Sequence, residues 1–106
     1  MTFGVRLTRQ AEADLERLFD FIIERELERP GGGNLALAEE ALGAIRASID
    51  TLRSSPFTCR KSSSNPFLRE LIISFGRSGY VALFEIEDAT HVVVLAVRHQ
   101  LEDDYH

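Results

Sequence analysis

The sequence predicts an α+β fold of order β-α-α-β-β-β, with an N-terminal edge strand, an antiparallel α-helical hairpin and a three-stranded antiparallel β-meander. Two amphipathic helical patterns lie between residues 9 and 52 and are separated by consecutive glycines. From Arg69 to His99, apolar residues follow the period of two that is typical of strands, interrupted by two turns. At 106 residues, the chain suits a single domain, 1–106, with one hydrophobic core.

Residues 3–7 alternate between apolar and polar or small side chains, which predicts a short strand at an edge of the sheet. Thr8 follows as an N-cap, because its side-chain oxygen can accept a hydrogen bond from a free amide of the first helical turn. A helix is then expected from about Arg9 to Glu28, since apolar side chains recur every three or four positions. Phe21 lies off this apolar stripe and should therefore be exposed.

Pro30 and the three glycines after it end this helix, because proline lacks an amide proton and glycine disfavours helical structure. Asn34 can cap a second helix, whose apolar stripe runs from Leu35 to Leu52 at steps of three and four. The short connection predicts that the two helices are antiparallel. Segment 54–66 is rich in serine and proline and is expected to be an irregular loop.

Three runs of strand-like residues predict the sheet. Residues 71–75 alternate, residues 76–79 supply a turn, and a second strand follows over residues 80–86. After a second turn at 87–90, residues 91–98 are almost wholly apolar and β-branched, a composition typical of a strand buried on both faces. This last run is therefore the expected central strand.

The formal net charge of −5 argues against direct, specific DNA binding, because proteins that grip nucleic acid usually carry a basic excess. A local basic patch remains, since residues 54–84 carry Arg60, Lys61, Arg69 and Arg77 against the single acid Glu70. The chain is thus acidic as a whole and basic over one segment.

Cys59 is the single cysteine, so no internal disulfide is possible, and its spacing from the three histidines predicts neither a metal site nor a cofactor. No apolar run reaches the ~20 residues of a membrane span, and the N-terminal residues lack the apolar core of a signal peptide. We therefore expect a cytoplasmic protein that does not enter the membrane.

The pattern A-x-x-D-L at Ala11 to Leu15 resembles the opening helix of the ParE/RelE toxin superfamily. Arg69 to Leu71, Gly76 to Tyr80 and Val94 to His99 resemble the sheet of that superfamily, especially its ParE-like plasmid-stabilisation branch. The resemblance spans nearly the whole chain. It implies the toxin of a type II toxin–antitoxin pair, bound in a hetero-oligomer by an antitoxin segment that folds on binding.

Two mechanisms occur in this superfamily. ParE-like members poison DNA gyrase by binding it, whereas RelE-like members cleave messenger RNA on the ribosome. RNA cleavage needs an acid and a base together with cations that stabilise the phosphate. For that chemistry the chain offers His99 as acid or base, Tyr80 to stack on a nucleobase, and Arg69, Arg77 and Arg98 to hold phosphate.

The charge balance favours the ParE-like mechanism, since the chain carries one lysine and a net charge of −5, whereas ribosome-directed nucleases are rich in lysine and arginine. We therefore expect a gyrase-directed toxin without catalytic residues. An inactive toxin-fold binding module is a third hypothesis. The residues expected to contact protein partners are Phe21, Arg60, Lys61, Arg77 and Tyr105.

Overall fold

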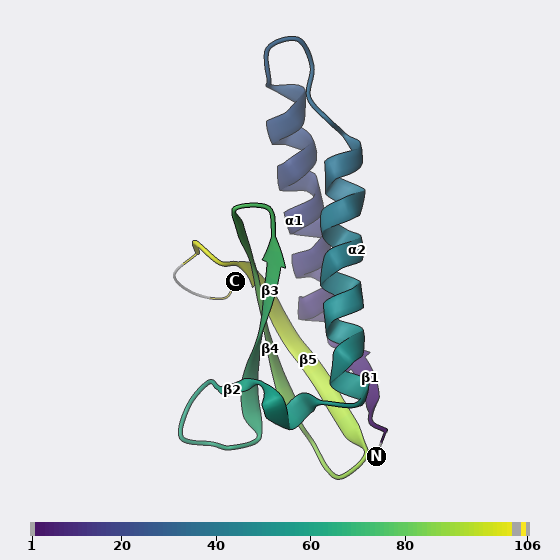
Figure 1. Ribbon diagram of the computed structural model, residues 1–106, viewed down its shortest axis with the longest axis vertical. Coiled ribbons are helices and arrows are strands. Elements are labelled where there is room, and N and C mark those ends of the chain that lie inside the picture. The colour runs from purple at the N-terminus through teal and green to yellow at the C-terminus, as the bar shows by residue number, and fades with distance from the viewer. Residues whose placement is uncertain (1, 103–104, 106) are drawn as a thin grey trace.

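The computed structural model describes residues 2–102 and 105 of the 106-residue chain. The predicted order of a strand, two helices and then antiparallel strands is confirmed (Figure 1). The elements, in chain order, are β1 (Gly4–Leu7), α1 (Arg9–Leu27), α2 (Ala36–Asp50), two 3₁₀ turns (Thr51–Arg53 and Pro56–Thr58), β2 (Arg60–Lys61), β3 (Leu68–Phe75), β4 (Ser78–Ile86) and β5 (His91–His99). The described helices include none that is both long enough and apolar enough to cross a membrane.

The strands form one mixed sheet of order β1-β5-β4-β3-β2. β1 runs parallel to β5, with Val5 beside Val92, and lies at the edge of the sheet as predicted. β5 pairs with β1 on one side and β4 on the other, and Val92, Val93 and Val94 are all buried. The prediction of a strand buried on both faces is therefore confirmed, although β4 is the middle strand because β2 extends the sheet beyond β3.

Segment 54–66 is more ordered than its composition predicts. It contains a 3₁₀ turn and β2, which pairs antiparallel with β3 so that Arg60 lies opposite Glu70. The Arg60 guanidinium forms a 2.9 Å ion pair with the Glu70 carboxylate. The prediction of an irregular loop was wrong for the two residues of β2, because the partner that makes them a strand lies outside the segment.

The two helices are antiparallel and cover the same face of the sheet (Figure 1). α1 begins at its predicted cap, where Thr8 Oγ1 accepts a 3.1 Å hydrogen bond from the Ala11 amide. Asn34 Oδ1 likewise accepts from the Ala36 amide at the start of α2. Leu35 was predicted in the apolar stripe but is exposed, because the connected ends of the helices extend beyond the sheet. The core between the layers includes Leu15, Leu18, Ile22, Ile45, Ile49, Tyr80, Phe84, Val94 and Val97.

The turn between β3 and β4 is shorter than predicted and consists of Gly76 and Arg77. Gly76 has a φ of 61°, a left-handed conformation that glycine adopts without steric cost. Ser78 and Gly79, which were predicted in the turn, begin β4 instead. Gly79 lies so close to the carbonyl oxygen of Ile73 that a Cβ atom there would overlap it.

Candidate functional site

A pocket of about 480 Å³ lies between α1 and the segment that follows β5, and we call it the Phe21 pocket. The Phe21 side chain is 57 % exposed, which confirms its predicted exposure, and Leu101 is 79 % exposed. Large apolar side chains that stand this far into solvent mark candidate docking surfaces when they cluster. The lining residues are Arg17, Leu18, Phe21, Arg25, His99, Leu101 and Glu102.

Helical geometry places Arg17, Phe21 and Arg25 on one face of α1, because they are spaced four residues apart. The Arg25 guanidinium lies 6.0 Å from the centre of the Phe21 ring. Arg17 forms a 3.0 Å ion pair with Glu102, which ties the segment after β5 to α1. Sequence reasoning missed both arginines as parts of a site, although their spacing around Phe21 was a readable signal.

His99 lies at the end of β5, where it lines the Phe21 pocket. Its Nδ1 accepts a 3.1 Å hydrogen bond from the Leu101 amide, so Nε2 carries the proton and donates to Ser78 Oγ at 3.0 Å. The ring meets the buried Tyr80 ring edge-on, with 5.5 Å between their centres. Burial raises the pKa of the Tyr80 hydroxyl, and the charge of Arg25 lowers it by less. Because Nδ1 accepts from the Leu101 amide and Nε2 donates to Ser78, both imidazole nitrogens of His99 form hydrogen bonds within the protein.

Arg98 lies on the opposite face of the sheet from His99, because successive residues of a strand point to opposite faces. Its Nη1 donates to the carbonyl oxygens of His99, Gln100 and Glu102, with the shortest bond, 2.7 Å, to Glu102. The guanidinium also lies 5.1 Å from the centre of the Tyr105 ring. Arg98 thus holds the segment that follows β5.

The Glu70 carboxylate contacts two of the predicted partner-binding residues, Arg60 and Tyr105. It pairs with Arg60 and accepts a 2.5 Å hydrogen bond from the Tyr105 hydroxyl. Arg98 approaches the same carboxylate at 4.0 Å. Burial raises the pKa of Tyr105, and the bond to Glu70 and its negative charge raise it further. Arg60 and Tyr105 are therefore engaged with Glu70.

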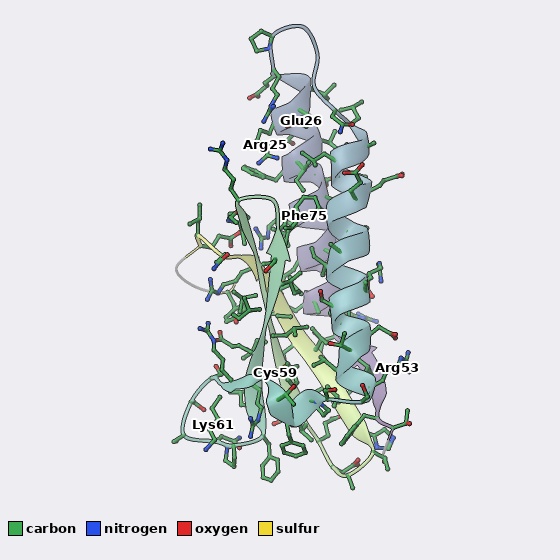
Figure 2. The ribbon with its side chains drawn as sticks, viewed as in Figure 1. Arg25, Glu26, Arg53, Cys59, Lys61 and Phe75 are labelled. Atoms are coloured by element: carbon green, nitrogen blue, oxygen red, sulfur yellow. The ribbon has the colours of Figure 1, made fainter. Side chains whose placement is uncertain are left out.

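Arg69 and Arg77 lie at opposite ends of β3. Arg69 is half-buried and is bonded within the protein, because it donates to the carbonyl oxygens of Phe57, Cys59 and Pro66. Arg77 lies exposed in the β3–β4 turn and has no hydrogen-bond or ion-pair partner among residues 2–102 and 105. Lys61 is exposed at the end of the molecule opposite Arg25 (Figure 2). Of the side chains nominated for RNA cleavage, those of His99 and Tyr80 are in ring contact, whereas Arg98 reaches only the backbone carbonyl oxygen of His99.

Cys59 is half-buried, and burial raises the pKa of its thiol, so it has the features of a structural cysteine. The described part of the chain contains no group of three or more potential metal ligands. His91 has an acidic partner in the structure. Its Nδ1 lies 2.9 Å from the Asp88 carboxylate, which reaches back across the β4–β5 turn.

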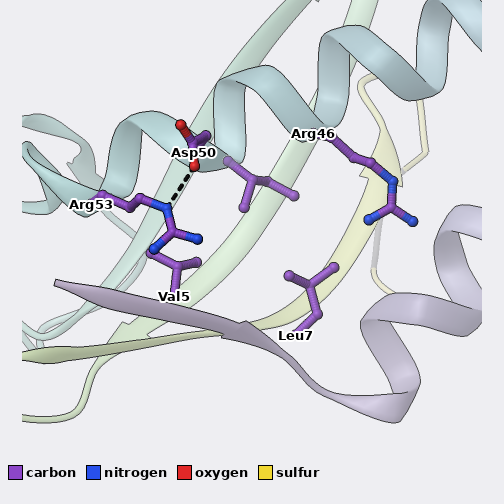
Figure 3. A pocket seen from close by; sticks show the side chains of 6 residues that line it. Val5, Leu7, Arg46, Asp50 and Arg53 are labelled. Atoms are coloured by element: carbon purple, nitrogen blue, oxygen red, sulfur yellow. Dashed lines mark hydrogen bonds and ion pairs between the residues drawn. The ribbon is translucent and has the colours of Figure 1, made fainter.

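A smaller pocket of about 130 Å³ lies between β1 and α2 (Figure 3). Val5 and Leu7 form its β1 side, and the 2.6 Å ion pair between Asp50 and Arg53 lies on the other. Arg46, which also lines the pocket, is paired with Glu12 at 3.7 Å, so each charged residue of the lining already has an ion-pair partner. The pocket is therefore a packing gap between the edge strand and the helix.

The fold and these surfaces define a small α+β protein in which a helical hairpin covers one sheet face and apolar pockets open to solvent. The family model described as the ParE toxin of the type II toxin–antitoxin system parDE matches residues 5–104. The chain therefore belongs to the ParE/RelE family of type II toxins.

One curated relative and two solved structures are similar to this chain. The chain is 32% identical over 103 residues to Toxin RelE1 of Caulobacter vibrioides, covering 96% of this chain and 98% of the relative. A chain of the chromosomal ParDE system of P. aeruginosa superposes with a TM-score of 0.71 at 20% identity, covering 92% of this chain and 96% of that one. A chain of the toxin–antitoxin complex RelBE2 of Mycobacterium tuberculosis superposes with a TM-score of 0.60 at 21% identity. This match covers 96% of this chain and 95% of that one. At these identities, the two structures establish the fold alone.

Proposed function

We propose that this toxin acts by binding a protein target, DNA gyrase, and not by cleaving RNA. The observation that carries the proposal is the dispersal of the groups that RNA cleavage needs. His99 and Tyr80 are in contact, but Arg98 faces the other side of the sheet and Arg69 is bonded to backbone carbonyls. The net charge of −5 supports the same conclusion, because a ribosome-directed nuclease must approach RNA phosphates.

The cognate antitoxin is the second proposed partner, and the Phe21 pocket is its proposed docking site. Two solved relatives come from toxin–antitoxin systems, ParDE and RelBE2. The exposed Phe21 and Leu101 suit the apolar anchors of an amphipathic segment, and Arg25 suits an acidic residue beside those anchors. The resulting hetero-oligomer would form in the cytoplasm, where gyrase acts.

A supercoiling assay tests the mechanism. Purified toxin added to gyrase and relaxed plasmid should reduce supercoiling as its concentration rises, and purified toxin added to translating ribosomes should leave the messenger RNA intact. Intact supercoiling together with cleaved messenger RNA, abolished by His99→Ala, would overturn the proposal.

RNA cleavage is the second candidate function, because one observation favours it. His99 lines the Phe21 pocket together with Arg17 and Arg25, so an acid–base group and two cations share one region, although the Tyr80 ring that contacts His99 is buried. Induced expression in a bacterium that lacks the antitoxin separates both candidates from an inactive binding module. Unimpaired growth at full expression would support the inactive module.

Antitoxin docking is tested by capture. The product of the reading frame beside the toxin gene, purified with an affinity tag, should retain wild-type toxin and lose the Phe21→Ala/Leu101→Ala variant. Ile72→Ala is the matched control, because Ile72 is an exposed apolar residue that does not line the Phe21 pocket. Equal capture of all three proteins would move the antitoxin to another surface.

A further inference from the structure

A second open pocket, of about 440 Å³, lies at the end of the molecule opposite the connected ends of the helices. It lies between the 3₁₀ turn Pro56–Thr58, the start of β3 and the β4–β5 turn, and we call it the aromatic pocket. The serine- and proline-rich composition and the basic residues of this region did not predict such a pocket. Its lining residues are Phe3, Phe57, Phe67, Ile86, Glu87, Asp88 and Ala89.

The walls of the aromatic pocket are phenylalanine rings in mutual contact. Phe57 meets Phe3 and Phe67 edge-on, and both pairs of ring centres are 6.5 Å apart. Phe57 is 51 % exposed and Phe67 is 49 % exposed, while Phe3 is buried. Two neighbouring half-exposed aromatic rings over an apolar floor form the kind of surface that anchors a partner's side chain.

The two exposed rings are held in place by their backbones. Arg69 donates to the Phe57 carbonyl at 3.0 Å and to the Pro66 carbonyl, directly before Phe67, at 2.8 Å. Its guanidinium lies 5.3 Å from the centre of the Phe57 ring. Phe67 is fixed further, because its amide donates to Asn65 and its carbonyl accepts from the Ile86 amide. The pocket is therefore preformed, and binding of a ligand does not incur the entropy cost of ordering its walls.

The rim of the aromatic pocket is acidic. Glu87 and Asp88 line it, and Arg6, which pairs with Glu87 at 3.0 Å, is the cation beside them. The Thr90 amide and then His91 hold the pKa of the Asp88 carboxyl below its usual value, although slight burial opposes them. Asp88 is therefore ionised at neutral pH. Both carboxylates line the pocket, whereas Arg6 and Arg69 contact lining residues without lining it themselves. An apolar floor lined by two carboxylates complements an apolar side chain with cationic neighbours.

We propose that the aromatic pocket receives an apolar side chain flanked by lysine or arginine on the enzyme that this toxin inhibits. The inference rests on the proposed function, since an enzyme that binds DNA carries lysine and arginine on the surfaces that hold phosphate. The acidic toxin would approach such a surface favourably. Contacts with the Phe57 and Phe67 rings would then fix the position of the toxin on the enzyme. The Phe21 pocket, on another part of the molecule, would bind the antitoxin.

The test compares the toxin concentration that halves gyrase supercoiling among single variants. Phe57→Ala and Phe67→Ala should each raise it by about tenfold or more, as loss of an interface anchor does. Asp88→Lys should raise it as well and should weaken its dependence on salt, because a charge attraction is removed. Ile72→Ala, the exposed apolar control, should leave it within about twofold of the wild type, a change below 0.5 kcal/mol that is ordinary for surface sites.

The outcomes separate this inference from the proposed function. Wild-type toxin without effect on gyrase would overturn both. Wild-type toxin that inhibits gyrase, with pocket variants that inhibit equally, would overturn the aromatic pocket alone. Pocket variants that keep full inhibition but lose capture by the antitoxin would assign the pocket to the antitoxin instead. Asp88→Lys changes an exposed turn residue and decides the matter even where a phenylalanine variant proves unfolded in thermal melting.

Discussion

The Asp14 carboxylate of α1 accepts a 2.9 Å hydrogen bond from the Val97 amide of β5, across 83 positions of sequence. β1 pairs with β5 only as far as Val94, so β1 leaves the Val97 amide without a strand partner. Asp14, which is buried, supplies the missing acceptor and also accepts from the Gln10 side chain at 2.9 Å. The aspartate of the A-x-x-D-L pattern thus joins the first helix to the sheet.

Replacing Asp14 with alanine should lower the free energy of unfolding by about 1–3 kcal/mol, because a buried amide loses its partner. Urea unfolding of the variant and the wild type measures this difference. Asp20→Ala, an exposed change on the same helix, should stay within about 0.5 kcal/mol of the wild type. Equal stability of Asp14→Ala and wild type would show that the bond contributes nothing.

Two glycines should respond to alanine with opposite signs. Gly79→Ala should destabilise the protein by about 1–3 kcal/mol, because the new methyl group would overlap the Ile73 carbonyl. Gly43→Ala should stabilise it by about 0.5–1 kcal/mol, because Gly43 is exposed within α2 and its added methyl group has free space. Thermal unfolding of both variants gives the two signs, and a stabilising Gly79→Ala would contradict the close packing of β3 and β4.

The contribution of Glu26 to stability should depend on pH. The Asn34 amide, 3.1 Å from the carboxylate, is the main cause that lowers the pKa of Glu26; burial opposes it, and Arg29 and Arg25 reinforce it. Because the folded-state pKa lies below the unfolded value of about 4.3, the stabilisation is complete above that pH and is lost as pH falls through the folded-state pKa. The stability difference between wild type and Glu26→Gln should therefore be constant near neutrality and shrink in acid. A stability difference that grows in acid would show that folding raises the pKa of Glu26 instead of lowering it.

Both tyrosines should resist ionisation in the folded protein. Burial is the first cause that raises the pKa of Tyr80 and of Tyr105, and Glu70 adds to it at Tyr105. At pH 10, absorbance at 295 nm should show far less tyrosinate in the native protein than in urea, where half of each residue ionises at about pH 10. The sign for stability follows: with a raised folded-state pKa, the stabilisation is complete below the unfolded-state pKa of about 10 and is lost progressively as pH rises through the folded-state pKa. Tyr105→Phe should leave a single native titration.

The order of elements was predictable because it depends on local periodicity. The cap at Thr8, the end of α1 near Pro30 and the burial of residues 92–94 all follow from side chains close in sequence, and the structure confirms them. β2 was not predictable, since two residues become a strand only when Glu70 and Arg69 arrive beside them. The turn at Gly76 and Arg77 was overestimated for the same reason, because strand pairing extended β4 backwards to Ser78.

The candidate sites were less predictable than the fold. The exposure of Phe21 followed from its place off the helical stripe. Arg69 was predicted to hold phosphate, but in the structure its guanidinium donates hydrogen bonds to the backbone at Phe57 and directly before Phe67. Tyr105 and Arg60 remain predicted partner contacts, and the structure adds that both are bound to Glu70, which the sequence did not predict. The partner of a side-chain hydrogen-bond donor is chosen by neighbours that are distant in sequence, such as Glu70 for Tyr105, and composition does not reveal those neighbours.

The sequence by itself therefore determined the α+β class, the helical hairpin, the buried strand at residues 91–98 and the resemblance to ParE/RelE toxins, since each rests on patterns a few residues long. Only the tertiary structure decided that Asp14 completes the edge of β5 and that phenylalanines 3, 57 and 67 meet in one pocket. These relationships join segments up to 83 residues apart, and they exist only once burial of the core has brought the helices and the sheet together.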